Sequence, residues 1–170
     1  GTNDVKHPGV KQIMNSGNYI LSGNPFLFEG YKPISISHLE LTPIQTRYLF
    51  NLYHWSNIIG FHTRNIPHRG HEHIQVKALN EIKADGIFIS PVTGVKNSGD
   101  FTAKAIIRCY EQLIKEKAYG TFGVLMGPFN TYSRYCGPRE AIFTAICRKN
   151  YGCNYFVVGR DHTGVGDFYQ

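Results

Sequence analysis

The sequence lacks several features that would each indicate a particular class of protein. It contains no run of 18 apolar residues, the length that a membrane-spanning helix needs, and residues 1–10 lack the charged-then-apolar pattern of a secretory signal. Its four cysteines include no Cys-x-x-Cys pair, which disfavours a zinc ribbon. We therefore expect a cytoplasmic protein with reduced thiols and no membrane partner.

Two common phosphate-binding motifs are also missing. Gly-x4-Gly-Lys-Ser/Thr does not occur, and no Gly-x-Gly-x-x-Gly follows the first predicted strand. The arginines and lysines do not form a basic block, although 18 of them against 12 acidic residues give a net charge of +6. This charge favours an anionic partner, and without a recognisable nucleic-acid module we expect small anions in a cleft and no nucleic acid.

What the sequence does contain is an alternation of strands and helices after a short irregular segment. Residues 1–36 are rich in Gly, Pro, Ser and Asn and predict turns and edge strands. Apolar runs then predict strands at residues 57–62, 86–90, 121–126 and 154–158. Helical spacing and capping residues predict helices at residues 42–53, 68–82, 101–117 and 138–150. The fold class expected is α/β, a parallel sheet flanked by helices on both faces, with a short N-terminal β-rich segment.

The unusual polar residues follow the predicted strands. They lie in four loops, at residues 62–71, 91–96, 127–139 and 159–166. Ligands of parallel α/β proteins bind beyond the carboxyl ends of the strands. We therefore expect these loops to converge on one cleft.

The first loop is the most distinctive, with four histidines and two arginines between residues 62 and 73. His68 and His71 fall in the first turn of a predicted helix, where free backbone N–H groups and a cationic face together suit an anion. The alternative is that these histidines are only structural or solvated side chains. The presence of Arg64 in the same stretch favours the anion site over that alternative. A zinc site would need a third ligand, and no metal site is predicted.

The third and fourth loops add further cations. Arg160 and Asp161 follow Gly159 directly after a buried strand, and an arginine there presents a planar fork to an oxyanion. Arg134 and Arg139 lie in the third loop, although Arg139 and Glu140 are equally expected to cap the following helix.

Four stretches carry a resemblance to a known family. They are HTRNIPHRGH at residues 62–71, RYCGPREA at 134–141, RKNYG at 148–152 and GRDHTGVG at 159–166. In this order and spacing they resemble the ATP sulfurylase (sulfate adenylyltransferase) family, over nearly the whole chain. The resemblance implies that residues 1–36 are the tail of a PUA-like N-terminal domain and that residues 37–170 form a Rossmann-like nucleotidyltransferase domain. Members of the family are considerably longer at both ends.

The resemblance also implies an activity and residue roles. The family transfers AMP from ATP to sulfate, with Mg²⁺, to give adenosine 5′-phosphosulfate and pyrophosphate. The residues matching its catalytic group are Thr63, Arg64 and Asn65. Those matching its ATP-binding residues are His62, Thr63, Arg64, Asn65, His68, His71, Gly159, Arg160, Asp161 and His162. Those matching its sulfate-binding residues are His62, Arg64, Arg160 and Thr163. A homo-oligomer is compatible with the family.

The expected chemistry agrees with these residue types. Sulfate is already deprotonated, so its attack on the α-phosphorus needs no general base. It needs cations and hydrogen-bond donors that offset repulsion between two anions and stabilise the charge on pyrophosphate.

Several positions depart from the family pattern. His62 replaces a usual glutamine, Thr163 a common alanine, and Ser90 and Thr144 frequent histidines, while Ile66-Pro67 reverses the usual order. Because three of these lie at the anion or its loop, the acceptor is less certain than the nucleotide. Three hypotheses stay open: a sulfate adenylyltransferase, an adenylyltransferase for another oxyanion or acid, and a nucleotide- or anion-binding module without turnover.

Overall fold

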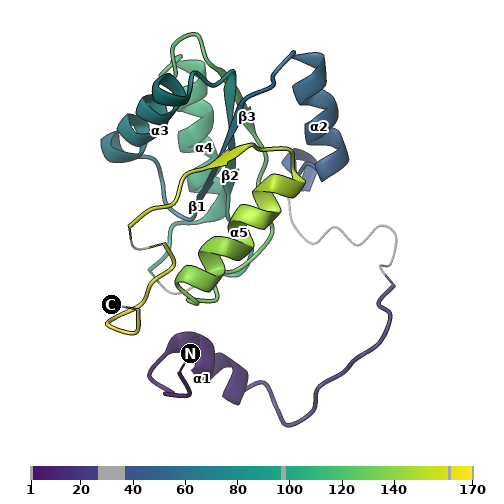
Figure 1. The fold of residues 1–170 in the computed structure, drawn as a ribbon. Coiled ribbons are helices and arrows are strands. Elements are labelled where there is room, and N and C mark those ends of the chain that lie inside the picture. The colour runs from purple at the N-terminus through teal and green to yellow at the C-terminus, as the bar shows by residue number, and fades with distance from the viewer. Residues whose placement is uncertain (1, 27–36, 97–98, 161, 170) are drawn as a thin grey trace.

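A parallel sheet of four strands forms the centre of the molecule (Figure 1). The computed structural model describes residues 2–26, 37–96, 99–160 and 162–169. The strands are β1 (Ile58–Thr63), β2 (Gly86–Pro91), β3 (Gly123–Met126) and β4 (Tyr155–Phe156), in the order β3-β2-β1-β4. Every pairing is parallel, which confirms the predicted sheet. β4 is shorter than predicted because it is an edge strand from which the chain leaves after Val157, whose N–H still donates to the carbonyl of Gly60 at 3.1 Å.

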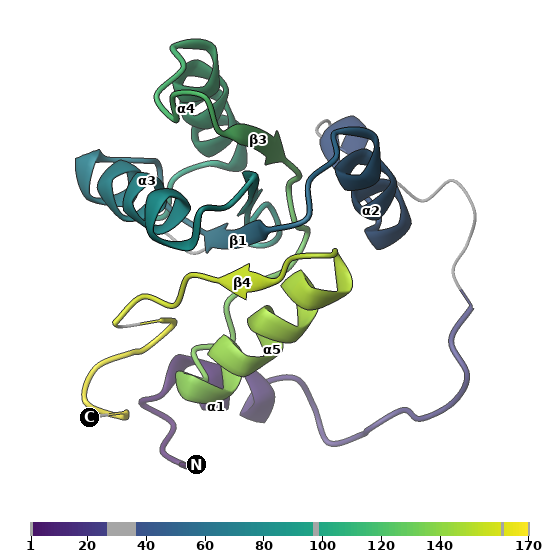
Figure 2. The same cartoon turned by 45° about the horizontal axis from the view of Figure 1, so that its top comes forward.

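Helices cover both faces of this sheet. They are α2 (Pro43–Leu52), α3 (Arg69–Ile82), α4 (Ala103–Lys115) and α5 (Pro138–Asn150), with a 3₁₀ turn at Ser37–Leu39. Figures 1 and 2 place α3 and α4 on one face and α2 and α5 on the other. The α/β class and all four predicted helices are therefore confirmed.

Two layers of apolar side chains fill the space between sheet and helices. The larger layer lies under α3 and α4 and contains Ile59, Phe61, Ile87, Ile89, Leu79, Ala84, Ile106, Tyr110 and Tyr119. The smaller lies on the opposite face and contains Ile58, Phe88, Phe50 and Cys153. Successive residues of a strand point to opposite faces, so odd positions of β1 face α3 and α4 while even positions face α2 and α5. This alternation decides where the site residues at the end of β1 point.

The start of α2 follows the predicted capping pattern. The Thr42 hydroxyl accepts from the N–H of Gln45 at 3.3 Å, and the Thr42 N–H donates to the Gln45 side chain at 2.8 Å. This reciprocal pair satisfies two of the N–H groups that a helix start leaves open.

The N-terminal segment differs from the expectation of edge strands. Residues 8–14 form the helix α1 (Pro8–Met14), and the structure assigns no strand to residues 2–26. The helix begins here because proline occupies its first position and the His7 side chain caps it, accepting from the N–H groups of Gly9 and Val10. The rest of the expected β-rich segment, residues 27–36, lies outside the described residues.

Two other sequence-based expectations concern cysteines and membranes. Cys109, Cys136, Cys147 and Cys153 are all free thiols in the structure. None of the helices in the described ranges is long and apolar enough to cross a membrane.

Candidate active site

The four loops that follow the strands meet at one edge of the sheet. The first and fourth are joined by His62 and His162, whose ring centroids lie 6.3 Å apart. The first and third are joined by Arg64 and Tyr135, where Arg64 Nη1 donates to the phenol oxygen at 3.2 Å. The second reaches the same place through Lys96, which lines a cavity together with Arg64. The predicted convergence at one edge is therefore seen, but the single cleft is not: the first three loops line the Arg64 cavity and the fourth does not.

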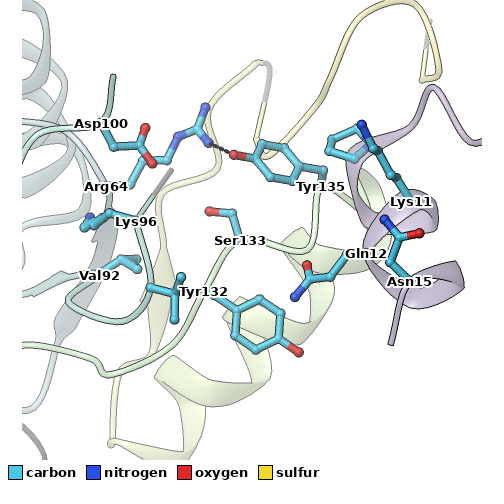
Figure 3. A pocket seen from close by; sticks show the side chains of 12 residues that line it. Lys11, Gln12, Asn15, Arg64, Val92, Lys96, Asp100, Tyr132, Ser133 and Tyr135 are labelled. Carbon is cyan, nitrogen blue, oxygen red and sulfur yellow. Dashed lines mark hydrogen bonds between the residues drawn. The ribbon is translucent and has the colours of Figure 1, made fainter. Parts of the chain in front are cut away.

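The cavity around Arg64 has a volume of about 490 Å³ and a cationic wall (Figure 3). Arg64 and Lys96 lie on one side with Asp100, and Lys11 and Gln12 of α1 lie on the other. The Lys96 Nζ is buried without a hydrogen-bond partner among the described residues, and burial lowers its pKa. An ammonium group held in this way is a strong candidate for contact with an anionic ligand.

The third loop is held in place by a buried carboxylate. Glu140 is in the first turn of α5, and its oxygens accept from the N–H of Arg134 at 2.9 Å and of Cys136 at 3.1 Å. The expected capping of α5 is not seen, because the N-cap is Gly137 without a side-chain cap and Glu140 binds the preceding loop, while Arg139 is exposed. Tyr135 lies between the two anchored N–H groups, so Glu140 fixes the backbone that presents Tyr135 to Arg64.

Arg134 does not join the Arg64 cavity. Its guanidinium lies over the rings of Tyr132 at 4.4 Å and Phe143 at 4.9 Å. It lines a separate cavity of about 790 Å³ beside α1, which contains none of the predicted catalytic, ATP-binding or sulfate-binding residues.

Of the three predicted catalytic residues, only Arg64 lines the cavity. Thr63 is at an odd position of β1 and is buried toward Tyr110, so its hydroxyl shapes the turn, accepting from the N–H of Asn65 at 3.1 Å. Asn65 is exposed. The turn that Thr63 stabilises directs Arg64 toward the third loop.

His62 is at an even position and faces α5. Its partner in the neighbouring strand is Ser90, and its Nδ1 atom is buried without a partner among the described residues. Burial, and next the positive charge of Arg148, lowers the His62 pKa to about 3. The imidazole is therefore neutral at physiological pH and offers hydrogen bonds but no charge.

His68 and His71 form a stacked pair at the start of α3. Their ring centroids are 3.9 Å apart, and His68 is the helix cap, its Nδ1 accepting from the N–H of Gly70 at 3.1 Å. A side chain at position 70 would come within 2.9 Å of the His68 ring, so glycine makes this cap feasible. Burial, and next His68, lowers the pKa of His71. Neither histidine lines the Arg64 cavity.

The fourth loop turns back toward the third. The His162 N–H donates to the carbonyl of Gly159 at 3.3 Å, and Thr163, at φ +49°, accepts with its carbonyl from the N–H of Gly137 at 3.4 Å. Arg160 is exposed, and Asp161 lies outside the described residues. His162 is thus brought to His62, while the Arg64 cavity is not lined by Gly159, Arg160, His162 or Thr163.

Sequence reasoning missed several residues around the cavity. Lys11 and Gln12 belong to a segment read as turns and edge strands, and only the fold brings α1 to the loops. Lys96 lay at the end of the second predicted loop without an assigned role, and its position after a buried strand was the available signal. Tyr135 carried no signal beyond membership of the RYCGPREA stretch.

The fold and these loops define a parallel α/β protein with a cationic cluster at the carboxyl edge of its sheet, the edge at which proteins of this class bind ligands. The sequence model of the ATP-sulfurylase family matches residues 37–170. The chain belongs to the ATP-sulfurylase family.

Curated relatives agree with this assignment. The chain is 44% identical over 168 residues to a sulfate adenylyltransferase of Trichodesmium erythraeum, and 43% identical over 168 residues to one of Ignicoccus hospitalis. Both alignments cover 99% of this chain, but 42% and 43% of the relatives. The chain thus spans about two-fifths of the length of the curated relatives it matches.

A solved structure shows the same fold. The hexameric APS kinase from Thiobacillus denitrificans matches with a TM-score of 0.55 at 23% identity, covering 76% of this chain and 26% of that one. At this identity the likeness concerns the fold alone.

Proposed function

We propose that this chain catalyses, or forms the core that catalyses, transfer of AMP from ATP to sulfate, giving adenosine 5′-phosphosulfate and pyrophosphate. The observation that carries the proposal is the meeting of Lys96, from the loop after β2, with Arg64 and His62 at the end of β1, at the carboxyl edge of the sheet. The family of the chain and the name sulfate adenylyltransferase of its relatives support it.

The chemistry needs charge stabilisation and alignment. A sulfate oxygen attacks the α-phosphorus, a new S–O–P linkage forms, and the bond from the α-phosphorus to the oxygen bridging to the β-phosphorus breaks. The electron pair leaves with pyrophosphate, and no proton has to be removed from sulfate. Arg64 offers a planar fork to the anions, and Lys96 adds a point charge on the same wall.

Residue roles follow from position. We assign Arg64 to the reacting anions, with Thr63 and Asn65 shaping its turn. The neutral His62 would hydrogen-bond sulfate, with Arg160 and the backbone of Thr163 completing the sulfate site. His68 and His71 would hold ATP phosphates at the start of α3. The loop containing Gly159, Arg160, Asp161 and His162 would bind adenosine.

Magnesium would arrive with the nucleotide. Mg²⁺ prefers oxygen ligands and keeps several waters, and the ATP phosphates supply such oxygens. The carboxylate lining the Arg64 cavity is Asp100, and the described residues contain no group of three His, Cys, Asp or Glu side chains that could hold a metal. These residues fit Mg²⁺ as part of MgATP, where it would neutralise charge on the departing pyrophosphate.

A second candidate is adenylyl transfer to another oxyanion or acid. It is favoured by His62, which puts a bulky neutral ring where the family usually has glutamine, beside Ser90 where the family often has histidine. The nucleotide half of the reaction would be unchanged.

The test is pyrophosphate release from MgATP by the purified chain, alone, with sulfate, and with molybdate as a surrogate. Release that depends on sulfate or molybdate supports adenylyl transfer. Release only with another acceptor favours the second candidate. ATP binding without release under any anion contradicts turnover by this chain and favours a binding module.

The proposal also covers the oligomeric state of the chain and its location in the cell. We propose a homo-oligomer, which light scattering of the purified chain would test; the structural neighbour is described as hexameric. The cytoplasmic location and the PUA-like origin of residues 1–36 stay predictions.

A further inference from the structure

Arg148 is completely buried on the face of the sheet that carries α5. Its exposed fraction is 0%, and its guanidinium is enclosed by three aromatic rings, with Cζ lying 4.5 Å from the centroid of Phe129, 4.7 Å from Tyr151 and 5.6 Å from Phe88. Nη1 donates to the hydroxyl of Ser90. Gly60 in β1 permits this packing, because a side chain there would lie 3.0 Å from Arg148 Cβ and Cγ.

The buried charge has no carboxylate partner among the described residues. Nε and Nη2 are buried without a hydrogen bond, and the ionisable groups that face Arg148 are His62, Tyr151, Cys147 and Cys153. Burying an unpaired cation is costly, and aromatic rings offset only part of the cost. An apolar side chain of similar volume would fill the same space without the cost, so packing alone does not explain an arginine here.

The position of Arg148 suggests why an arginine is buried here. Ser90, which accepts from Nη1, is the neighbour of His62 across the β1–β2 pair, and Phe129 contacts both Arg148 and the His62 ring. Arg148 therefore lies directly behind His62. The other titratable groups that face His62 are His162, from the fourth loop, and Lys96, from the second.

We propose that Arg148 is a positioning residue of the oxyanion site, a buried guanidinium that places a fixed positive charge behind His62 and raises the affinity for the acceptor anion. It acts through the field at His62 and through Ser90. This inference rests on the proposed function, because it takes the His62 end of the site as the place of the acceptor.

The experiment compares Arg148→Met with the wild-type chain. Thermal unfolding is followed against sulfate and molybdate concentration at constant ionic strength, and the KM values for sulfate and ATP are measured separately. We expect Arg148→Met to unfold, without anion, at the same or a higher temperature, because an unpaired buried charge has been removed. We expect its sulfate-dependent stabilisation to shrink and its KM for sulfate to rise about tenfold, with a smaller change for ATP.

Three further variants separate charge from packing. Arg108→Met on the exposed surface of α4 loses the same net charge and should respond to sulfate as the wild type does. Arg148→Lys keeps the charge and should keep most of the response. Ser90→Ala keeps the charge but frees the guanidinium, and should raise the KM for sulfate less than Arg148→Met does.

The outcomes are distinguishable. If the wild-type chain responds to sulfate and Arg148→Met responds equally, the inference is wrong. If Arg148→Met is too unstable to measure, wild-type sulfate dependence in Ser90→Ala refutes the role of the held guanidinium, whereas a raised KM for sulfate there with a near-wild-type Arg148→Lys supports it. If the wild type neither binds nor uses sulfate or molybdate, the proposed function itself has failed.

Discussion

Arg64 and Tyr135 meet although 71 residues separate them in the sequence. Arg64 Nη1 lies 3.2 Å from the phenol oxygen, and Cζ lies 5.4 Å from the ring centroid. Tyr135 thus holds the Arg64 guanidinium by a hydrogen bond to its hydroxyl and by contact with its ring. These contacts order the long arginine side chain before any ligand binds. A cation ordered in this way costs less entropy on binding than a free one.

Arg64→Ala should abolish most oxyanion-dependent turnover. Loss of a pre-oriented cation at a charge-transfer site reduces kcat by about 10²- to 10³-fold. Pyrophosphate release measures the effect, and circular dichroism checks the fold. Arg64→Lys keeps the charge without the fork and should recover only part of the rate, while Arg108→Ala on the exposed face of α4 should have none of these effects. Native spectra with full activity in Arg64→Ala would refute the assignment.

His68 contributes to helix stability and, we propose, to phosphate binding, and two substitutions separate these effects. His68→Ala removes both the cap and the imidazole, whereas asparagine is a good helix cap and lacks only the ring. We expect both variants to raise the KM for ATP or slow turnover about tenfold, as for one lost hydrogen bond to a charged group. Only the alanine variant should lose about 1 kcal/mol of stability. Unaltered kinetics in His68→Asn would contradict the phosphate role.

His62→Gln should improve the use of sulfate. Glutamine is neutral, like the buried imidazole, but flexible and less bulky, so it would leave more room for the acceptor beside Ser90. The measurement is kcat/KM for sulfate and for molybdate under saturating MgATP. An identical ratio of the two anions in variant and wild type would show that His62 does not set anion preference.

The lowered pKa of His62 predicts that the folded state loses stability in acid. Its pKa falls from an ordinary value of 6.5 to about 3, so between these values the unfolded chain binds a proton that the folded chain does not. Stability is therefore lost as the pH falls below 6.5, by up to about 2 kcal/mol at pH 5 from this residue. Urea unfolding at pH 7.5 and pH 5 should show a smaller loss for His62→Gln than for the wild type. His71 and His162, whose pKa values burial also lowers, leave some sensitivity in both.

Glu140→Gln tests the anchoring of the third loop. In the wild type the Glu140 carboxylate accepts from the N–H groups of Arg134 and Cys136. The glutamine amide keeps only one acceptor oxygen and turns its NH₂ group toward one of these donors. We expect a loss of about 2 kcal/mol in the free energy of unfolding, with reduced turnover because Tyr135 is less well placed. Glu111→Gln on the exposed surface of α4 is the matched control. Equal stability of both variants would show that the anchor is unimportant.

Local signals predicted most of the fold. The Thr42 cap, the apolar run of β2 and the proline that opens α5 each act within a few residues, and all three elements appear where expected. The N-terminal segment was misread because glycine, asparagine and serine dominate its composition. The helix there depends on a histidine cap, a weaker signal than the usual serine, threonine or aspartate.

The site was less predictable than the fold. Its loops were placed correctly, because parallel strands end at a common edge. The direction of each side chain was not, since alternation along β1 sends Thr63 into the core and His62 toward α5. The contacts of Lys96 and Arg148 come from segments that are distant in the sequence, so no local sequence pattern could predict them.

His7 ties the beginning of the chain to this edge of the sheet. Its Nε2 lies 2.7 Å from the carbonyl of Tyr135 and 3.0 Å from the hydroxyl of Tyr169, contacts that span 128 and 162 residues. The wall that Lys11 and Gln12 form is therefore held by contacts of high sequence separation, so loosening Tyr135 or Tyr169 would release α1 and open the cavity on that side.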